Sequence, residues 1–234
     1  MPAPVAHEGS TIDAVVVVGW LTRFADLVDR DRVLLTELDT SIGDGDHGIN
    51  LARGMGAVRA RLGTAVPEDS QRAAAICRDA GMTLISTVGG ASGPLYGTFL
   101  RRLGGSLPAD AGADLDAFAI AARAGLDGII ALGHAEPGDK TMVDAMGPAV
   151  EALETAASGG APLGAALRRA AMAAAAGSDG TIPLIARKGR ASYLGDRSRG
   201  HRDPGAASTA LLFEALADAF DRAPAIPDAG QAPR

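Results

Sequence analysis

Three aspartates and two glycines stand within eight residues, in the stretch Leu38-Asp39-Thr40-Ser41-Ile42-Gly43-Asp44-Gly45-Asp46. On one helix, Asp39, Asp44 and Asp46 would point about 140° and 200° apart, so a helix alone cannot gather their carboxylates. Gly43 and Gly45 can, because glycine accepts the backbone conformations that fold a loop back on itself. Gathered carboxylates repel one another unless a hard cation lies between them. The spacing therefore predicts a Mg²⁺ site.

A helix is predicted directly after this loop, over residues 47–62. Its first backbone N–H groups would face the carboxylates, and the N-terminus of a helix favours a phosphate group. The residues themselves thus indicate a site for a metal ion together with a phosphate compound.

The loop allows three other interpretations. Gly43, Gly45 and Gly48 have the spacing of a dinucleotide-binding fingerprint, but no convincing strand precedes them. An EF-hand calcium loop is excluded because Ile49 occupies the position of its invariant glycine and Met55 that of its glutamate. A solvated turn between two helices stays open as an alternative.

Composition limits the function classes. The 234 residues carry a net charge of −6, which argues against general nucleic-acid binding. Cys77 is the single cysteine, so no internal disulfide can form. A chain without disulfides fits a reducing compartment. The apolar run 14–20 is too short to cross a bilayer and has no basic segment before it. We therefore expect a soluble, cytoplasmic protein without a membrane partner.

Helical periodicity without strand alternation predicts an all-α fold, a bundle or barrel of about eight helices. We expect a flexible N-terminal arm over residues 1–9, one helical domain over 10–222 and a disordered tail over 223–234. One further helix begins near residue 94, and the others are predicted over residues 12–30, 31–38, 47–62, 67–88, 114–132, 141–157, 162–176 and 204–220.

Three other stretches can carry chemistry. Residues 89–93 form a glycine-rich break between helices that could lie against a ligand or serve as a plain connection. In 136–141, Lys140 and Thr141 either contact a ligand or cap the following helix. Residues 187–205, the longest irregular segment, collect basic side chains that could bind phosphate, contact an acidic partner or simply be solvated.

Four motifs, at residues 43–48, 89–98, 136–142 and 187–195, together resemble the L subunit of dihydroxyacetone kinase (DhaL). The resemblance extends over about residues 18–220. It implies a barrel of eight antiparallel helices with the nucleotide site at one end.

By this resemblance, Asp39, Asp44 and Asp46 hold two Mg²⁺ ions against the phosphates of ADP or ATP. No catalytic residue is implied, apart from Arg190 as a stabiliser of phosphate charge. The implied nucleotide contacts are His47, Gly48, Ile49, Asn50, Ala91, Ser92, Gly133, Met142, Arg190, Asp203, Pro204 and Gly205.

The resemblance implies phosphoryl transfer to dihydroxyacetone, which a separate K subunit holds covalently on a histidine. In one branch of the family, an M subunit of the phosphoenolpyruvate-dependent phosphotransferase system rephosphorylates bound ADP; this branch is favoured here. ATP-dependent phosphorylation of dihydroxyacetone or a related ketose is one alternative, and an ADP-loaded co-regulator of a transcription factor is another. A homodimer is also left open.

Overall fold

The computed structural model describes residues 11–63, 72–109 and 111–223, and every regular element within them is helical. This confirms the all-α prediction. In chain order the elements are α1 (Ala14–Arg30), α2 (Arg32–Ile42), α3 (His47–Leu62), α4 (Ala73–Thr87), α5 (Ser92–Ser106), α6 (Leu115–Gly133), α7 (Val143–Ser158), α8 (Leu163–Gly180), the 3₁₀ segment η2 (Arg190–Ser198) and α9 (Pro204–Arg222).

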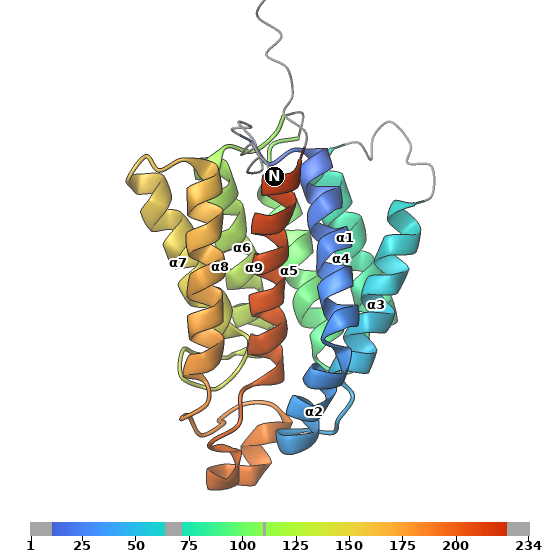
Figure 1. Cartoon of the computed structure of the whole chain (residues 1–234), viewed down its shortest axis with the longest axis vertical. Helices are drawn as coiled ribbons and strands as arrows, with labels where there is room; N and C mark the ends of the chain where they lie inside the picture. Colours follow the sequence, from blue (N-terminus) through green and yellow to red (C-terminus); the bar gives the residue numbers. More distant parts are fainter. Residues whose placement is uncertain (1–10, 64–71, 110, 224–234) are drawn as a thin grey trace, which may run out of the picture.

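Eight of these helices, α1 and α3 to α9, close into a barrel. Each packs against the next one in order, and α9 returns to pack against α1. The two remaining elements, α2 and η2, contact each other at one end of the barrel, the lower end in Figure 1. The predicted barrel is therefore present, with two short elements added across one mouth.

Small residues let the helices approach closely. A Cβ on Gly81 of α4 or on Gly97 of α5 would lie 2.6 Å from the other residue's carbonyl oxygen, so neither position has room for a side chain. Large side chains fill the centre instead: Trp20 and Phe118 are buried and meet edge to face, with ring centroids 6.4 Å apart. Burial of such rings supplies much of the stability of a core.

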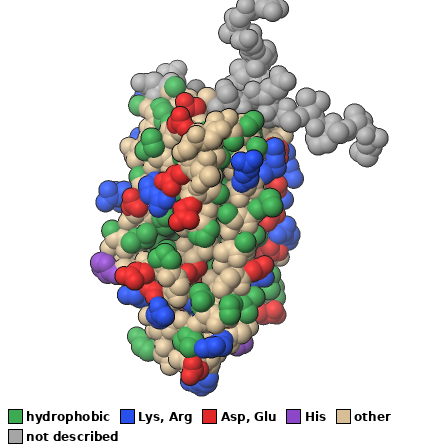
Figure 2. All heavy atoms as spheres, turned by 90° about the vertical axis from the view of Figure 1, so that its left-hand side faces the viewer, with side chains coloured by type: hydrophobic (Ala, Val, Ile, Leu, Met, Phe, Trp, Pro, Cys, Tyr) green, Lys and Arg blue, Asp and Glu red, His purple; other side chains and the backbone are tan. Residues whose placement is uncertain are grey.

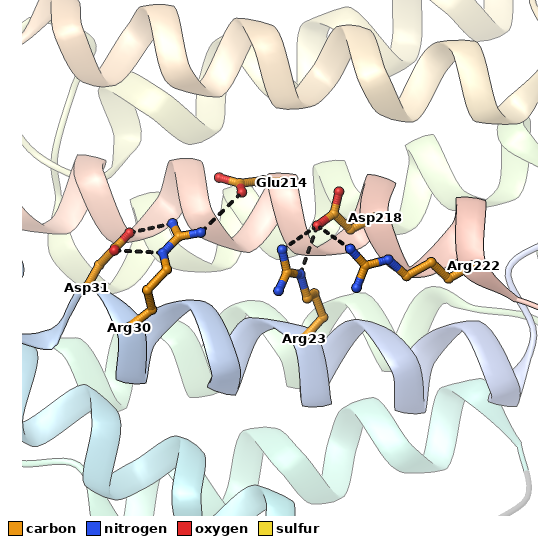
Figure 3. A network of polar contacts seen from close by, with 6 residues as sticks. All are labelled: Arg23, Arg30, Asp31, Glu214, Asp218 and Arg222. Carbon is orange, nitrogen blue, oxygen red and sulfur yellow. Dashed lines mark hydrogen bonds and ion pairs between the residues drawn. The ribbon is translucent and has the colours of Figure 1, made fainter. Parts of the chain in front are cut away.

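Charged side chains line the seam where α9 meets α1 (Figure 3). Asp218 of α9 pairs with Arg23 of α1 at 2.8 Å and with Arg222 at 3.8 Å, and Arg30 of α1 lies 4.0 Å from Glu214. These side chains are partly exposed, and such pairs contribute about 0–1 kcal/mol each. The seam therefore depends mainly on its apolar contacts.

One face of the molecule is mixed in charge. On the face drawn in Figure 2, acidic and basic side chains are interspersed, without one dominant sign. Among the described residues, no helix combines the length and apolar character needed to span a bilayer.

Helix α2 corrects one prediction. It runs to Ile42 instead of ending at residue 38, so Asp39 lies in its last turn and not on the loop. The hydroxyl of Thr40 donates to the carbonyl of Thr36, and that of Ser41 to the carbonyl of Glu37. These hydroxyl groups bond back to the preceding turn, which keeps two poor helix formers helical.

Three further element boundaries differ from the predictions. Helix α8 runs to Gly180, four residues beyond the predicted end, and η2 occupies part of the segment predicted to be irregular. Helix α4 begins at Ala73, and residues 64–71, where its start was predicted, lie outside the described residues. The predicted N-terminal arm, 1–9, and all of the predicted tail except Ala223 also lie outside them.

Candidate functional site

A cavity of about 290 Å³ opens at the barrel end that carries α2 and η2. The segments that follow α2, α4, α6 and α8 meet there, so residues far apart in the sequence share one wall. The predicted site residues among its lining are Asp39, Asp44, Asp46, His47, Asn50, Ala91, Ser92, Gly133, Met142, Arg190, Asp203 and Pro204.

The structure brings the three aspartates together. Asp39, Asp44 and Asp46 can each present one carboxylate oxygen within 4.8 Å of the others. The loop is shaped by its glycines: Gly45 has a φ of 74°, and a Cβ on Gly43 would overlap the carboxylate of Asp39. Three clustered anionic oxygen donors are the ligand set that a hard divalent cation prefers, so these residues fit Mg²⁺.

Backbone N–H groups fix the buried member of this cluster. Oδ2 of Asp39 accepts from the N–H groups of Asp46 at 2.8 Å and His47 at 3.1 Å. These bonds tie the end of α2 to the start of α3 and hold the carboxylate beside the N-terminus of α3. A positive helix end and a cation site therefore share one corner of the cavity.

Arg190, the first residue of η2, reaches the same cluster. Its guanidinium lies 3.0 Å from Oδ2 of Asp44, and both side chains are partly exposed at the mouth of the cavity. The pair places a fixed positive charge beside the carboxylates. A guanidinium in this position can bind phosphate oxygens.

His47 is buried in the cavity wall between two hydroxyl groups. Its Nδ1 lies 2.9 Å from Oγ of Ser92, and its Nε2 lies 2.9 Å from Oγ of Ser208. Burial lowers the pKa of His47, although the charges of Asp39 and Asp46 act in the opposite direction. The ring is thus a buried, hydrogen-bonded part of the wall.

Asp203 caps the N-terminus of α9. Its carboxylate accepts from the N–H of Ala206 at 2.7 Å. The pKa of Asp203 is raised to about 7, mainly because the carboxyl is buried. The bond from Ala206 and the charge of Lys140 act against this rise, and the charges of Asp144 and Asp39 add to it. A buried carboxyl that titrates near neutrality therefore borders the cavity.

Lys140 is buried instead of capping the next helix, so that interpretation of its role was wrong. Its Nζ donates to the carbonyl of Thr181 at 2.6 Å and to the carbonyl of His201, and burial lowers its pKa. The N–H of Gly200 donates to the carbonyl of Ile182 beside it. One ammonium group therefore joins both ends of the segment that carries Arg190.

The side chain of Thr141 bonds to the start of α7, although the N-cap of that helix is Met142. Oγ1 of Thr141 accepts from the N–H of Val143 at 3.2 Å, and Asp144 accepts from the N–H of Thr141 at 2.7 Å. The cavity lining also includes the apolar residues Leu95, Ile129, Met142 and Val143. Such a surface can take a flat, weakly polar ring.

Three predicted contact residues do not line the cavity. Gly48 is packed against α2, where a Cβ would overlap the carbonyl of Arg32. Ile49 is 54% exposed and borders a second hollow, on the outer side of α2 and α3. Gly205 lies in the first turn of α9, next to Met142.

Three buried residues behind the cavity were missed: Tyr96, Ser208 and Thr209. Tyr96 OH lies 2.6 Å from Oγ of Ser208 and 3.0 Å from Oγ1 of Thr209, and burial raises its pKa. The signal available was the adjacent polar pair Ser208 and Thr209 within the otherwise apolar start of α9. Their partner on α5 could not be read from that pattern.

Comparison with known proteins identifies the family. The family model of the DAK2 domain matches residues 41–218. The ADP-binding subunit DhaL of the PEP-dependent dihydroxyacetone kinase of Escherichia coli is 44% identical over 201 residues, which are 86% of this chain and 94% of that protein. The chain belongs to the DhaL family. The DhaL subunit of a PTS-dependent dihydroxyacetone kinase of Lactococcus lactis is 40% identical over 88% of this chain and 96% of its own length.

Longer relatives contain the same domain. The L-erythrulose 1-kinase of Mycolicibacterium smegmatis is 37% identical over 94% of this chain, which covers 38% of that protein. The crystal structure of the dihydroxyacetone kinase of C. freundii superposes with a TM-score of 0.65 at 26% identity, covering 93% of this chain and 37% of that one. A second structure of that kinase, in complex with AMP-PNP and Mg²⁺, gives 0.61 at 27% identity.

Proposed function

We propose that this chain is the ADP- and Mg²⁺-binding subunit of a phosphoenolpyruvate-dependent dihydroxyacetone kinase. The observation that carries the proposal is the carboxylate cluster at the N-terminus of α3, in a chain that aligns with nearly the full length of a DhaL subunit of that activity. In this role the chain relays a phosphoryl group to dihydroxyacetone and is active only together with partner subunits.

Each site residue has a role that follows from its charge: the carboxylates bind metal ions, and the positively charged groups bind phosphate. Asp39, Asp44 and Asp46 would hold two Mg²⁺ ions, which supply charge neutralisation for the nucleotide phosphates when bound. The N–H of His47 is taken by Asp39, so the phosphate oxygens would bind the other N–H groups of the first turn of α3. Arg190 would stabilise the charge on the transferring group. No side chain of the cavity forms a covalent intermediate in this scheme, so positioning and electrostatics supply the rate enhancement.

The proposed nucleotide contacts are those that the family resemblance implies, and the cavity supports most of them. Its polar corner suits a diphosphate and its apolar residues an adenine ring. Gly48, Ile49 and Gly205 do not face the cavity through side chains, so any contact from Gly48 or Gly205 would come from the backbone.

The proposal requires two partner proteins. A K subunit holds dihydroxyacetone and contributes the acceptor oxygen, and an M-type phosphoprotein of the phosphotransferase system returns a phosphoryl group to bound ADP. Because phosphoenolpyruvate is a cytoplasmic metabolite, the proposal also places the chain in the cytoplasm.

A second candidate is the L part of an ATP-dependent kinase for dihydroxyacetone or a related ketose. The 37% identity to an L-erythrulose 1-kinase favours it. The two candidates differ in how tightly the nucleotide is held, because ADP must stay bound to be rephosphorylated in place, whereas ATP must exchange.

The first test measures nucleotide in the protein as purified. The chain is denatured, and released nucleotide is quantified with and without prior EDTA treatment. Near-stoichiometric ADP that EDTA removes is the expected result. A protein that is empty but binds ATP with Mg²⁺ would support the ketose kinase instead, and one that binds neither nucleotide would overturn both.

A variant tests the metal site directly. Asp44→Ala removes one of three carboxylates and the partner of Arg190, so we expect ADP–Mg²⁺ binding to be lost while helical circular dichroism is unchanged. Asp116→Ala, an exposed carboxylate in the first turn of α6, is the matched control. Unchanged ADP affinity in Asp44→Ala would contradict the proposed role.

A further inference from the structure

A line of hydrogen-bonded side chains leads from the cavity wall into the barrel. Ser92, at the start of α5, contacts Nδ1 of His47 on α3, and Nε2 of His47 contacts Ser208 on α9, each at 2.9 Å. Ser208 in turn lies 2.6 Å from the hydroxyl of Tyr96 on α5. His47, Ser208 and Tyr96 are all buried, so water does not compete for these bonds.

The direction of this line decides what Ser92 can offer a ligand. A neutral imidazole has one N–H donor and one acceptor nitrogen, so two arrangements exist. If Nε2 of His47 carries the proton, Ser92 must donate to Nδ1 and has only lone pairs left. If Nδ1 carries it, the ring donates to Ser92, whose own O–H is free to donate into the cavity.

The contacts behind the ring favour the second arrangement. Three oxygens lie within reach of the hydroxyl of Tyr96: Oγ of Ser208 at 2.6 Å, Oγ1 of Thr209 at 3.0 Å and the carbonyl of Gly205 at 3.3 Å. A phenol is a stronger hydrogen-bond donor than an aliphatic hydroxyl, so Tyr96 donates and Ser208, the nearest of the three, accepts. Ser208 must then give its own proton to Nε2 of His47, at 2.9 Å, or to the carbonyl of Gly205, at 3.1 Å. The imidazole nitrogen is the more basic and the nearer of the two acceptors, so Ser208 donates to the ring.

We propose that Tyr96 and Ser208 are positioning residues that hold His47 in the Nδ1–H form, so that Ser92 presents a hydrogen-bond donor to an anionic ligand. The proposal rests on the proposed function for the identity of that ligand, a nucleotide phosphate, which accepts hydrogen bonds and donates none. An Nε2–H ring would set a lone pair of Ser92 against the phosphate and weaken binding.

The direct test is ¹⁵N NMR of the histidine rings in the free, full-length chain. Long-range proton–nitrogen correlations distinguish a protonated ring nitrogen from a bare one, and His47→Gln assigns the signals. We expect a protonated Nδ1 and a bare Nε2 in the wild type, and a shift towards Nε2–H in Ser208→Ala. A protonated Nε2 in the wild type would overturn the proposal.

The binding test is a double-mutant cycle in which calorimetry measures the affinity of each variant for ADP in the presence of Mg²⁺. We expect Ser92→Ala and Ser208→Ala each to weaken binding about tenfold and the double variant to be little worse than either, because both remove the same donor. If the two single variants' losses of binding free energy simply add in the double variant, the proposal is wrong.

Tyr96→Phe keeps the ring in place and removes only the hydroxyl, so it tests the line even if Ser208→Ala unfolds. We expect weaker ADP binding and a mixed tautomer signal; an unchanged tautomer in this variant counts against the proposal. Tyr193→Phe removes a hydroxyl from a residue of η2 that is 88% exposed, so it should change neither the ADP affinity nor the tautomer signal of His47. A wild type that shows the Nδ1–H form but binds no ADP would refute the proposed function and leave the ring assignment standing.

Discussion

Asp203 allows a quantitative prediction about pH. Its carboxyl is buried at the start of α9, and burial raises its pKa to about 7 from an ordinary value of 3.8. Between these two values the folded chain keeps a proton that the unfolded chain loses. The stability contributed by this group is therefore fully present below pH 3.8 and is lost as the pH rises through about 7.

The size of the effect follows from the two pKa values. Proton linkage gives about 2.7 kcal/mol of stabilisation at pH 5 and close to zero at pH 8. Asp203→Asn keeps an oxygen that can accept from the N–H of Ala206 but has no titrating proton. The stability difference between the wild type and this variant should therefore change by about 2.5 kcal/mol between pH 5 and pH 8.

Trp20 provides the assay, because it is the single tryptophan and is fully buried. Its fluorescence follows urea unfolding of both proteins at several pH values, in EDTA and without nucleotide. Asp116→Asn, an exposed carboxylate on α6, controls for loss of one charge and should show no comparable trend. If the difference in the free energy of unfolding between the wild type and Asp203→Asn is the same at pH 5 and pH 8, the predicted role of Asp203 is wrong.

Three further substitutions have defined outcomes. Lys140→Met removes the ammonium that joins two loop carbonyls, so thermal unfolding should show that the free energy of unfolding falls by about 1–3 kcal/mol. Arg169→Met, at an exposed residue, should leave that free energy unchanged. Equal losses in the two variants would contradict the role of Lys140. Gly48→Ala should force α3 away from α2, lowering both the melting temperature and ADP affinity, whereas Gly56→Ala on the same helix has open space and should stabilise slightly. Ser178→Ala deletes a buried hydroxyl that has no partner among the described residues and should raise the free energy of unfolding in urea by about 1 kcal/mol; a decrease would show a partner that the structure lacks.

The carboxylate cluster was accessible from the sequence because it is local. Asp39, Asp44 and Asp46 lie within eight residues, and the intervening glycines leave few other ways to fold. The end of α2 was predicted too early because threonine and serine usually favour helix ends over helix interiors. The hydroxyl bonds of Thr40 and Ser41 to the preceding turn reverse that preference here.

Contacts between distant segments could not be predicted in the same way. Lys140 meets Thr181 and His201 only because the loops after α6 and α8 emerge at the same barrel end. The bond between Tyr96 and Ser208 depends on how α5 and α9 are rotated about their axes. Hydrophobic periodicity gives the buried face of each helix but leaves the pairing of polar groups across the core undetermined.

The arrangement of the barrel also limits how this domain can be tethered to another one. The start of α1 and the end of α9 both lie at the end of the barrel away from the cavity (Figure 1). In α9 alone, 19 residues at 1.5 Å each separate the two ends by about 28 Å. A segment joined at either point must run that length before a domain attached to it can reach the cavity of its own chain. A domain on a shorter tether could reach only the cavity of a second chain.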